Sequence, residues 1–187
     1  MTPPLILLLA ILSLLLAMAL IGLGVVSRRQ HRRLQQLLVE ARHDPLTGLA
    51  NRRGLQAHWN ALSGEKALIL IDLEGFKAVN DSHGHIVGDA LLKQVALRLA
   101  SAIVPPGMVA RWGGDEFVAV IPADRVDAQQ ALISNARALA YDLSASGGPA
   151  SVRVGTRTGV ATGAADLESA MRSADAMLME NRARQGS

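Results

Sequence analysis

Four carboxylates occur as two close pairs in the middle of the chain. Asp72 and Glu74 stand two residues apart at the end of an apolar run, and Asp115 and Glu116 follow a Gly-Gly dipeptide. Carboxylate oxygens are hard ligands that suit Mg²⁺, which proteins commonly hold together with phosphate oxygens. If the two pairs meet at one edge of a sheet, they predict a metal and phosphate site. Either Asp alone is better explained as a turn residue, so the prediction depends on both pairs.

Residues that suit a nucleotide follow the first pair. Gly75, at a strand-to-helix turn, allows backbone N–H groups to approach phosphates, and Lys77 can neutralise their charge. Asn80, His85 and Asp89 come next, and amide and carboxylate groups can hydrogen-bond the edge of a guanine. The same polar residues are also typical caps of a helix start. Base recognition and helix capping therefore both stay open from the residues alone.

Helical and strand-like patterns alternate from residue 44 onwards. The predicted helices cover 51–62, a face from Leu91 to Leu99, a face from Leu132 to Leu143 and a face from Leu167 to Leu178; the predicted strands cover 67–73, 108–112, 117–121 and 152–160. The continuous apolar run 67–73 indicates a strand buried on both faces. The strands around the Gly-Gly dipeptide indicate a β-hairpin. This order predicts an α/β (α+β) sandwich of ferredoxin-like type.

The N-terminal segment is apolar, and no charged side chain precedes Arg28. The run from residue 5 to residue 26, at ~1.5 Å per residue, would span about one hydrocarbon core. A cleaved signal peptide needs a basic start, a shorter apolar run and a small-residue cleavage site, which fit this segment poorly. We therefore expect residues 1–26 to be one uncleaved transmembrane helix that precedes the sandwich.

Four arginines, at positions 28, 29, 32 and 33, follow the apolar run directly. The positive-inside rule places such a cluster in the cytoplasm, where it contacts lipid headgroups. We expect residues 27–43 to form a basic juxtamembrane linker helix and residues 44–187 to form a cytoplasmic domain. The predicted location is the inner (cytoplasmic) membrane, crossed once.

Composition excludes several classes of protein. The chain has no cysteine, which excludes disulfide scaffolds, thiolate zinc sites and cysteine nucleophiles. Apart from the arginine cluster the chain is close to neutral, and aromatic residues make up only 3%. A nucleic-acid-binding protein would spread basic and aromatic residues over a face of the folded domain. Nucleic acid is therefore not an expected partner.

Residues 111–117, Arg-Trp-Gly-Gly-Asp-Glu-Phe, resemble the signature hairpin of the GGDEF family, the diguanylate cyclases. Three upstream stretches agree with the family in order and spacing: 44–53, 72–77 and 80–89. The resemblance implies a palm like that of the nucleotidyl cyclases and the condensation of two GTP molecules into cyclic di-GMP and pyrophosphate, a bacterial second-messenger reaction. It also implies a homodimer, because two protomers, each holding one GTP, must face each other.

The resemblance also implies roles for particular residues. It implies Mg²⁺ as cofactor. Its ligands would be Asp72, the Leu73 carbonyl and Asp115; the catalytic residues would be Asp115, Lys77 and Glu116; GTP would be bound by Asn80, His85, Asp89, Phe76 and Arg182. Asp115 would hold the metal and also activate the attacking hydroxyl.

The chain departs from the family pattern at several positions. Val104 and Gly107 stand where an inhibitory motif has arginine and aspartate, so the allosteric product site is absent. Gly186 stands where a phosphate-binding arginine is usual, Met179 replaces a tyrosine, and Arg157 replaces a small serine. These departures keep an alternative open: a catalytically degenerate module that binds GTP or partner proteins at the membrane.

Overall fold

The computed structural model describes residues 18, 20–24, 26–30, 33, 41–127 and 140–185. The chain divides into two compact units, Met1–Ala41 and Arg42–Ser187. The described residues of the first unit up to residue 33 are helical. Among the described residues, no helix has the length and apolar character needed to cross a membrane; most of the predicted span 1–26 lies outside them. The predicted linker helix does not reach residue 43, because His43 pairs with Ala50 in an isolated antiparallel bridge.

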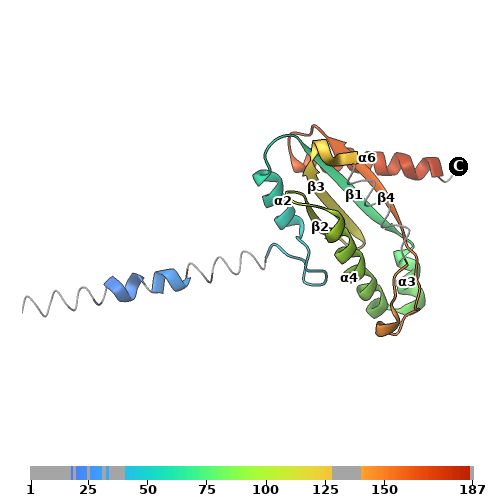
Figure 1. Cartoon of the computed structure of the whole chain (residues 1–187), viewed down its shortest axis with the longest axis horizontal. Coiled ribbons are helices and arrows are strands. Elements are labelled where there is room, and N and C mark those ends of the chain that lie inside the picture. The colour runs from blue at the N-terminus through green and yellow to red at the C-terminus, as the bar shows by residue number, and fades with distance from the viewer. Residues whose placement is uncertain are drawn as a thin grey trace, which may run out of the picture. The chain divides into compact units, whose positions relative to one another are not determined.

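The second unit contains a four-stranded sheet, shown in Figure 1. Its strands are β1 (Lys66–Glu74), β2 (Met108–Gly113), β3 (Glu116–Pro122) and β4 (Gly155–Thr162). They lie in the order β2-β3-β1-β4, and each neighbouring pair is antiparallel. This is the strand arrangement of a ferredoxin-like sandwich, as predicted. Strand β4 begins later than predicted, since Val152 makes only an isolated bridge with Tyr141.

The described helices of this unit are α2 (Arg52–Ala61), α3 (Phe76–His83), α4 (His85–Ala102) and α6 (Leu167–Gln185), with short 3₁₀ turns η1 (Ala123–Arg125) and η2 (Ser144–Ser146). Helix α3 was not predicted as a separate element. Gly84 ends it with φ 82° and ψ 165°, a conformation outside the helical region, and α4 starts at the next residue. The helix predicted over Leu132 to Leu143 lies largely outside the described residues; Leu143 itself precedes η2 and is not helical.

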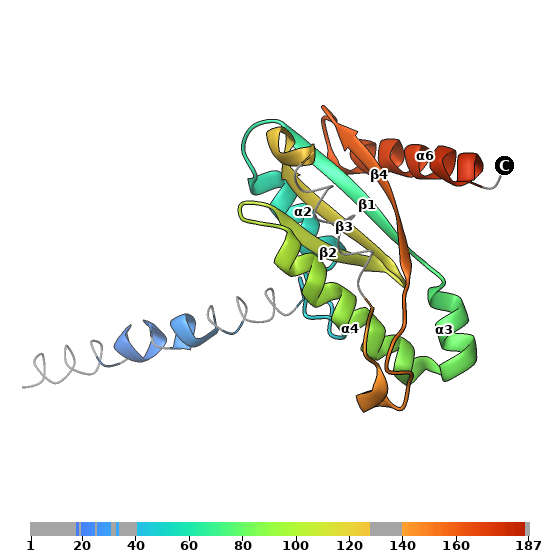
Figure 2. The ribbon, with the colours of Figure 1, turned by 45° about the vertical axis from the view of Figure 1, so that its right-hand side comes forward.

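Strand β1 is buried on both faces, which explains its continuous apolar sequence. Ile69 and Ile71 belong to the core beneath α4, whereas Leu68 and Leu70 belong to the core beneath α2 and α6. Figure 2 shows α4 and α6 on opposite faces of the sheet. Because side chains alternate along a strand, Asp72 faces the same side as Leu70, toward α6.

Helix α6 is fixed closely to the outer strand β4. A Cβ at Gly159 would collide with the Ala174 carbonyl oxygen, so only glycine permits this approach. The Val160 N–H donates to Met177 Sδ at 3.2 Å, and Asn181 Nδ2 donates to the Thr158 carbonyl at 3.2 Å. These contacts give partners to backbone groups of an edge strand that would otherwise be open to pairing with another chain.

Candidate active site

The two carboxylate pairs meet at one end of strands β1 and β3. The register of the antiparallel pair places Asp72 opposite Glu116, and the Leu73 N–H donates to the Asp115 carbonyl oxygen at 3.3 Å. Asp115 lies in the two-residue turn between β2 and β3. The convergence predicted from the sequence is therefore confirmed, while the role of each residue stays a prediction.

Negative charge accumulates at this end of the sheet. Burial raises the pKa of Glu116 above its ordinary value, and the carboxylates of Asp72 and Asp115 raise it further; Arg52 acts in the opposite direction. A carboxyl group whose pKa is raised by neighbouring carboxylates is one that a cation would stabilise in its ionised form. The electrostatics therefore favour a positively charged ligand here.

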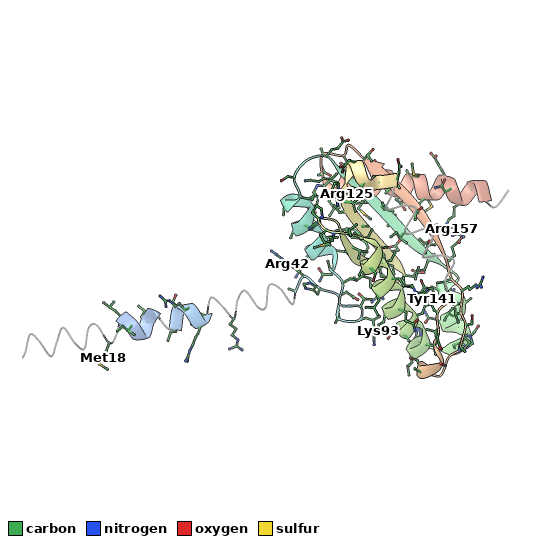
Figure 3. All side chains as sticks on the ribbon, in the orientation of Figure 1. Met18, Arg42, Lys93, Arg125, Tyr141 and Arg157 are labelled. Atoms are coloured by element: carbon green, nitrogen blue, oxygen red, sulfur yellow. The ribbon has the colours of Figure 1, made fainter. Side chains whose placement is uncertain are left out.

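Two arginines already contact the Asp72 carboxylate. Arg182 Nη2, from α6, lies 2.8 Å from Asp72 Oδ2, and Arg157 Nη1, from β4, lies 3.9 Å from the same oxygen. Arg157 Nε also lies 2.6 Å from Glu74 Oε1, at an angle that makes it an ion pair rather than an aligned hydrogen bond. Figure 3 labels Arg157 on β4. Arg182 therefore does reach the carboxylate cluster, across 110 positions of sequence.

The donor set suits Mg²⁺. Asp72 and Asp115 offer carboxylates and Leu73 offers a backbone carbonyl, all hard oxygen ligands. Within the described ranges, no group of three or more acidic or histidine side chains is arranged to hold a metal ion by itself. That pattern fits an ion that uses one or two carboxylates and takes its remaining ligands from phosphates and water.

Asn80 is the best-defined residue of the predicted base-recognition group. Its Oδ1 is buried and has no hydrogen-bond partner in the described part of the chain. The amide lies against Gly88 of α4, where any Cβ would collide with it. A buried amide oxygen without a partner is costly unless a ligand or water completes it. Gly88 thus makes room for the Asn80 amide, whose oxygen still lacks a donor among the described residues.

The other predicted ligand residues lie on the same two helices but do not form a preformed cluster. Lys77, His85 and Asp89 are exposed, and no hydrogen bond or ion pair within the described ranges joins them to the carboxylates. Phe76 is partly buried against the core beneath α4. Gly75 precedes α3 with φ 84° and provides no side-chain cap, so the first N–H groups of α3 have no capping acceptor from that residue.

A network around the β2–β3 hairpin was missed by the sequence reasoning. Arg111 Nη1 lies 3.2 Å from Asp44 Oδ1, and Arg111 Nε and Nη2 donate to the Gly114 carbonyl at 3.0 and 2.8 Å. Asp44 in turn accepts hydrogen bonds from the Thr47 N–H and hydroxyl. Burial alone would raise the pKa of Asp44, but the hydrogen bonds from Thr47 and the Arg111 charge outweigh it and lower that pKa. Asp44 and Arg111 therefore brace the turn that carries Asp115.

Arg52 holds the same hairpin from the start of α2. Its Nε donates to the Trp112 carbonyl at 2.6 Å, and its guanidinium lies 4.7 Å from the centre of the Trp112 ring. The sequence contained a signal for both braces, because the stretches 44–53 and 111–117 each carry charged residues. Only the fold shows that those charges meet.

A surface hollow of about 280 Å³ opens on the α6 side of the hairpin. Its lining consists of Leu70, Trp112, Glu116, Met171, Arg172 and Asp175. Glu116 therefore borders both this hollow and the carboxylate cluster.

The two positions that lack the arginine and aspartate of the inhibitory motif differ in their surroundings. Val104 is 49% exposed and apolar. Gly107 is enclosed: a Cβ there would lie 2.9 Å from Ile103 Cγ2 and from Ile121 Cγ2. An aspartate at 107 would therefore require its neighbours to shift.

The comparisons with known proteins agree on one family. The family model described as diguanylate cyclase, GGDEF domain, matches residues 41–187. The probable diguanylate cyclase DgcE of Escherichia coli (strain K12) is 43% identical over 101 residues, which are 50% of this chain and 9% of that protein. Diguanylate cyclase DgcM of the same strain is 37% identical over 127 residues, 64% of this chain and 31% of that protein. The chain thus matches less than a third of the length of either relative.

Solved structures resemble the fold over a larger share. The coiled coil and GGDEF domain of DgcB from Caulobacter crescentus, solved in complex with c-di-GMP, superposes with a TM-score of 0.74 at 25% identity, covering 89% of this chain and 94% of that one. Diguanylate cyclase SiaD from Pseudomonas aeruginosa, in complex with its activator SiaC, gives a TM-score of 0.69 at 26% identity, covering 88% and 68%.

Proposed function

The chain belongs to the GGDEF family of diguanylate cyclase domains, and from that premise we propose that it condenses two GTP molecules into cyclic di-GMP and pyrophosphate. The observation that carries the proposal is the strand register that sets Asp72 opposite Glu116, with Asp115 in the adjoining turn. The convergence gives the reaction the carboxylates that it needs at one place.

The proposed reaction takes place between two protomers that each hold one GTP. The 3′-hydroxyl of each nucleotide attacks the α-phosphorus of the other. Two O–P bonds form, the two bonds from the α-phosphorus to the α–β bridging oxygen break, and two pyrophosphates leave. Asp115 accepts the proton of the attacking hydroxyl. Asp72, Asp115 and the Leu73 carbonyl would hold Mg²⁺, which supplies charge neutralisation at the phosphates. Glu116 adds a further acidic group beside them.

The nucleotide is bound by residues of α3, α4 and α6 in this proposal. The buried Asn80 amide and the Asp89 carboxylate hydrogen-bond the guanine edge, with His85 beside them. Lys77 and Arg182 neutralise phosphate charge, and Lys77 also stabilises the charge of the transition state. Phe76 packs beside the nucleotide at the start of α3.

We also propose that the catalytic domain is attached to the inner membrane. The support is the apolar run 5–26 and the arginine cluster at 28–33, which orients the following residues toward the cytoplasm and its GTP. A reporter that works only in the cytoplasm, fused after Ser187, should be active. A periplasmic signal, or a mature protein that lacks residues 1–26, would contradict the anchor.

The decisive test is an assay for the product. Purified full-length chain, incubated with GTP and Mg²⁺, should yield cyclic di-GMP and pyrophosphate, detected by chromatography and mass spectrometry. ATP in place of GTP should give no cyclic product. Absence of product from a folded chain that binds GTP would reject the cyclase.

A second candidate is the degenerate GTP-binding module at the membrane. It is favoured by the two arginines that contact Asp72, since Arg157 and Arg182 offer the carboxylate a cation other than a metal ion. This candidate predicts GTP binding without turnover, so the same assay together with a binding measurement distinguishes the two.

A further inference from the structure

Arg157 is a cation of the site to which the proposed reaction gives no role. It stands on β4 directly opposite Asp72 in the register of the antiparallel pair. Its side chain is 28% exposed, so it is accessible from solvent, and it lies beside the carboxylate that would hold the metal and its phosphates. We propose that Arg157 is a further substrate-binding residue that donates hydrogen bonds to a phosphate of the nucleotide. This inference rests on the proposed function.

Glu74 holds Arg157 in position. Its Oε1 lies 2.6 Å from Arg157 Nε, and its Oε2 occupies the space where Gly155 would carry a Cβ. Gly155 is the register partner of Glu74, so the glutamate lies across β4 toward Arg157. A side chain at 155 would displace Glu74. Glu74 is thus a positioning residue, and Gly155 makes its position possible.

The outer end of the guanidinium keeps its hydrogen-bonding capacity. A guanidinium has five N–H donors, four of them on its two terminal nitrogens. Nη1 lies 3.9 Å from Asp72 Oδ2, which is an ion-pair distance but too long for a hydrogen bond. No hydrogen bond from these terminal nitrogens occurs within the described ranges.

Phosphate fits the geometry of these donors. Two parallel N–H groups of a guanidinium match two oxygens of one phosphate, and such charge-assisted pairs are among the strong hydrogen bonds. Arg182 Nη2 lies 2.8 Å from the same oxygen, Asp72 Oδ2, so a phosphate at Asp72 would lie near two cations. Their charges offset the repulsion that the carboxylates exert on an anion.

The test measures binding rather than turnover. The full-length chain is titrated by calorimetry, with saturating Mg²⁺, with three ligands: guanosine, inorganic triphosphate, and a GTP analogue whose α–β bridging oxygen is a methylene group. In Arg157→Gln, the Kd for the analogue and for inorganic triphosphate should rise by about tenfold or more, and the Kd for guanosine should stay unchanged. Arg125→Gln is the matched control, because Arg125 is exposed and lies in η1, beyond the opposite end of β3.

Further variants separate positioning from direct contact. Glu74→Gln should raise the Kd for the analogue several-fold. Added to Arg157→Gln, it should raise that Kd no further, as expected if Glu74 acts only through Arg157. Arg157→Lys keeps the charge without the fork and should lose part of the affinity. If thermal unfolding shows that Arg157→Gln is not folded, the binding affinities of Arg157→Lys test the proposal in its place.

Each outcome supports or overturns the proposal. The proposal would be overturned if Arg157→Gln weakened the binding of guanosine and of the analogue equally. It would also be overturned if a folded Arg157→Gln chain bound the analogue as tightly as wild type or more tightly. If wild type binds inorganic triphosphate through Arg157 but forms no cyclic di-GMP, the phosphate site stands and the cyclase fails. If wild type forms product and Arg157→Gln binds the analogue normally, the cyclase stands and the Arg157 site fails.

Discussion

Asp115 occupies a turn, so its removal should affect chemistry far more than stability. Asp115→Ala removes the group that accepts the hydroxyl proton and binds the metal, and kcat should fall on the order of 10²-fold or more. A partly exposed turn residue contributes less than ~1 kcal/mol to folding. Initial rates of product formation and thermal unfolding measure the two effects.

The exposed Asp124 of η1 provides the control for that experiment. Asp124→Ala makes the same chemical change far from the carboxylate cluster and should leave the rate unchanged. Turnover near that of wild type by a folded Asp115→Ala chain would reject Asp115 as the base.

Asn80 should affect specificity rather than the chemical step. Asn80→Ala removes a base contact made in both ground and transition states, so KM for GTP should rise about tenfold while kcat changes little, and discrimination against ATP should weaken. Gly88→Ala should act in the same direction, because its Cβ collides with the Asn80 amide. Steady-state kinetics with both nucleotides measures this. Unchanged selectivity in both variants would assign Asn80 to helix structure instead.

Single residues show where the sequence was informative. The convergence of the pair Asp72 and Glu74 with the pair Asp115 and Glu116 could be expected, because each pair stands at the end of a predicted strand. The contacts of Arg157 with Glu74 and Asp72 could not, because they depend on the register of β4 against β1, which no local pattern specifies.

At the scale of elements, the β2–β3 hairpin depends on its braces. Asp44→Asn should lower the free energy of unfolding by about 2 kcal/mol at pH 7, since it weakens hydrogen bonds to a charged group. The pKa of Asp44 is below its ordinary value of 3.8 in the folded chain, so its stabilisation is present above pH 3.8 and is lost as the pH falls through the folded value. Denaturant unfolding at several pH values tests this.

The pH dependence is the sharper part of that prediction. The difference between wild type and Asp44→Asn should shrink as the pH falls below 3.8 and disappear once the carboxyl is protonated in both the folded and the unfolded state. If the difference in the free energy of unfolding stayed constant over the whole pH range, the charge of Asp44 would make no contribution to stability.

Helices and strands could be predicted where the pattern of apolar and polar residues in their own sequence determined them. Strand β1 was evident because both of its faces are buried. Helix α3 was not, because its break from α4 depends on the backbone conformation of Gly84 rather than on polarity. The start of β4 was placed too early for a related reason: Val152 is apolar but pairs with Tyr141 instead of joining the sheet.

At the scale of the whole molecule, the site of one protomer supplies only one of the two GTP molecules that the proposed reaction joins. Since two protomers must each present one GTP, activity per chain should rise with chain concentration until dimers saturate. Rates measured over a hundredfold dilution series, alongside the mass from light scattering, test this. Constant activity per chain in a range where the protein is monomeric would exclude the two-protomer reaction.

Contacts between distant parts of the chain set the limit of sequence reasoning. Arg111 and Asp44 are 67 positions apart, and Arg182 and Asp72 are 110 apart. Composition and periodicity describe neighbours within a few turns, whereas these pairs exist only because the sheet order brings β1, the hairpin and α6 together.

The enclosed position of Gly107 restricts how this lineage can evolve feedback control. An inhibitory product site of the family type needs both an arginine at 104 and an aspartate at 107, but the aspartate first meets Ile103 and Ile121. Because a Cβ at 107 would meet both isoleucines, selection would encounter the packing penalty before any benefit from ligand binding, unless smaller residues arose first at both 103 and 121. A smaller residue at either position would itself remove packing from the core, so each route from this sequence to an autoinhibited one includes a step that costs stability.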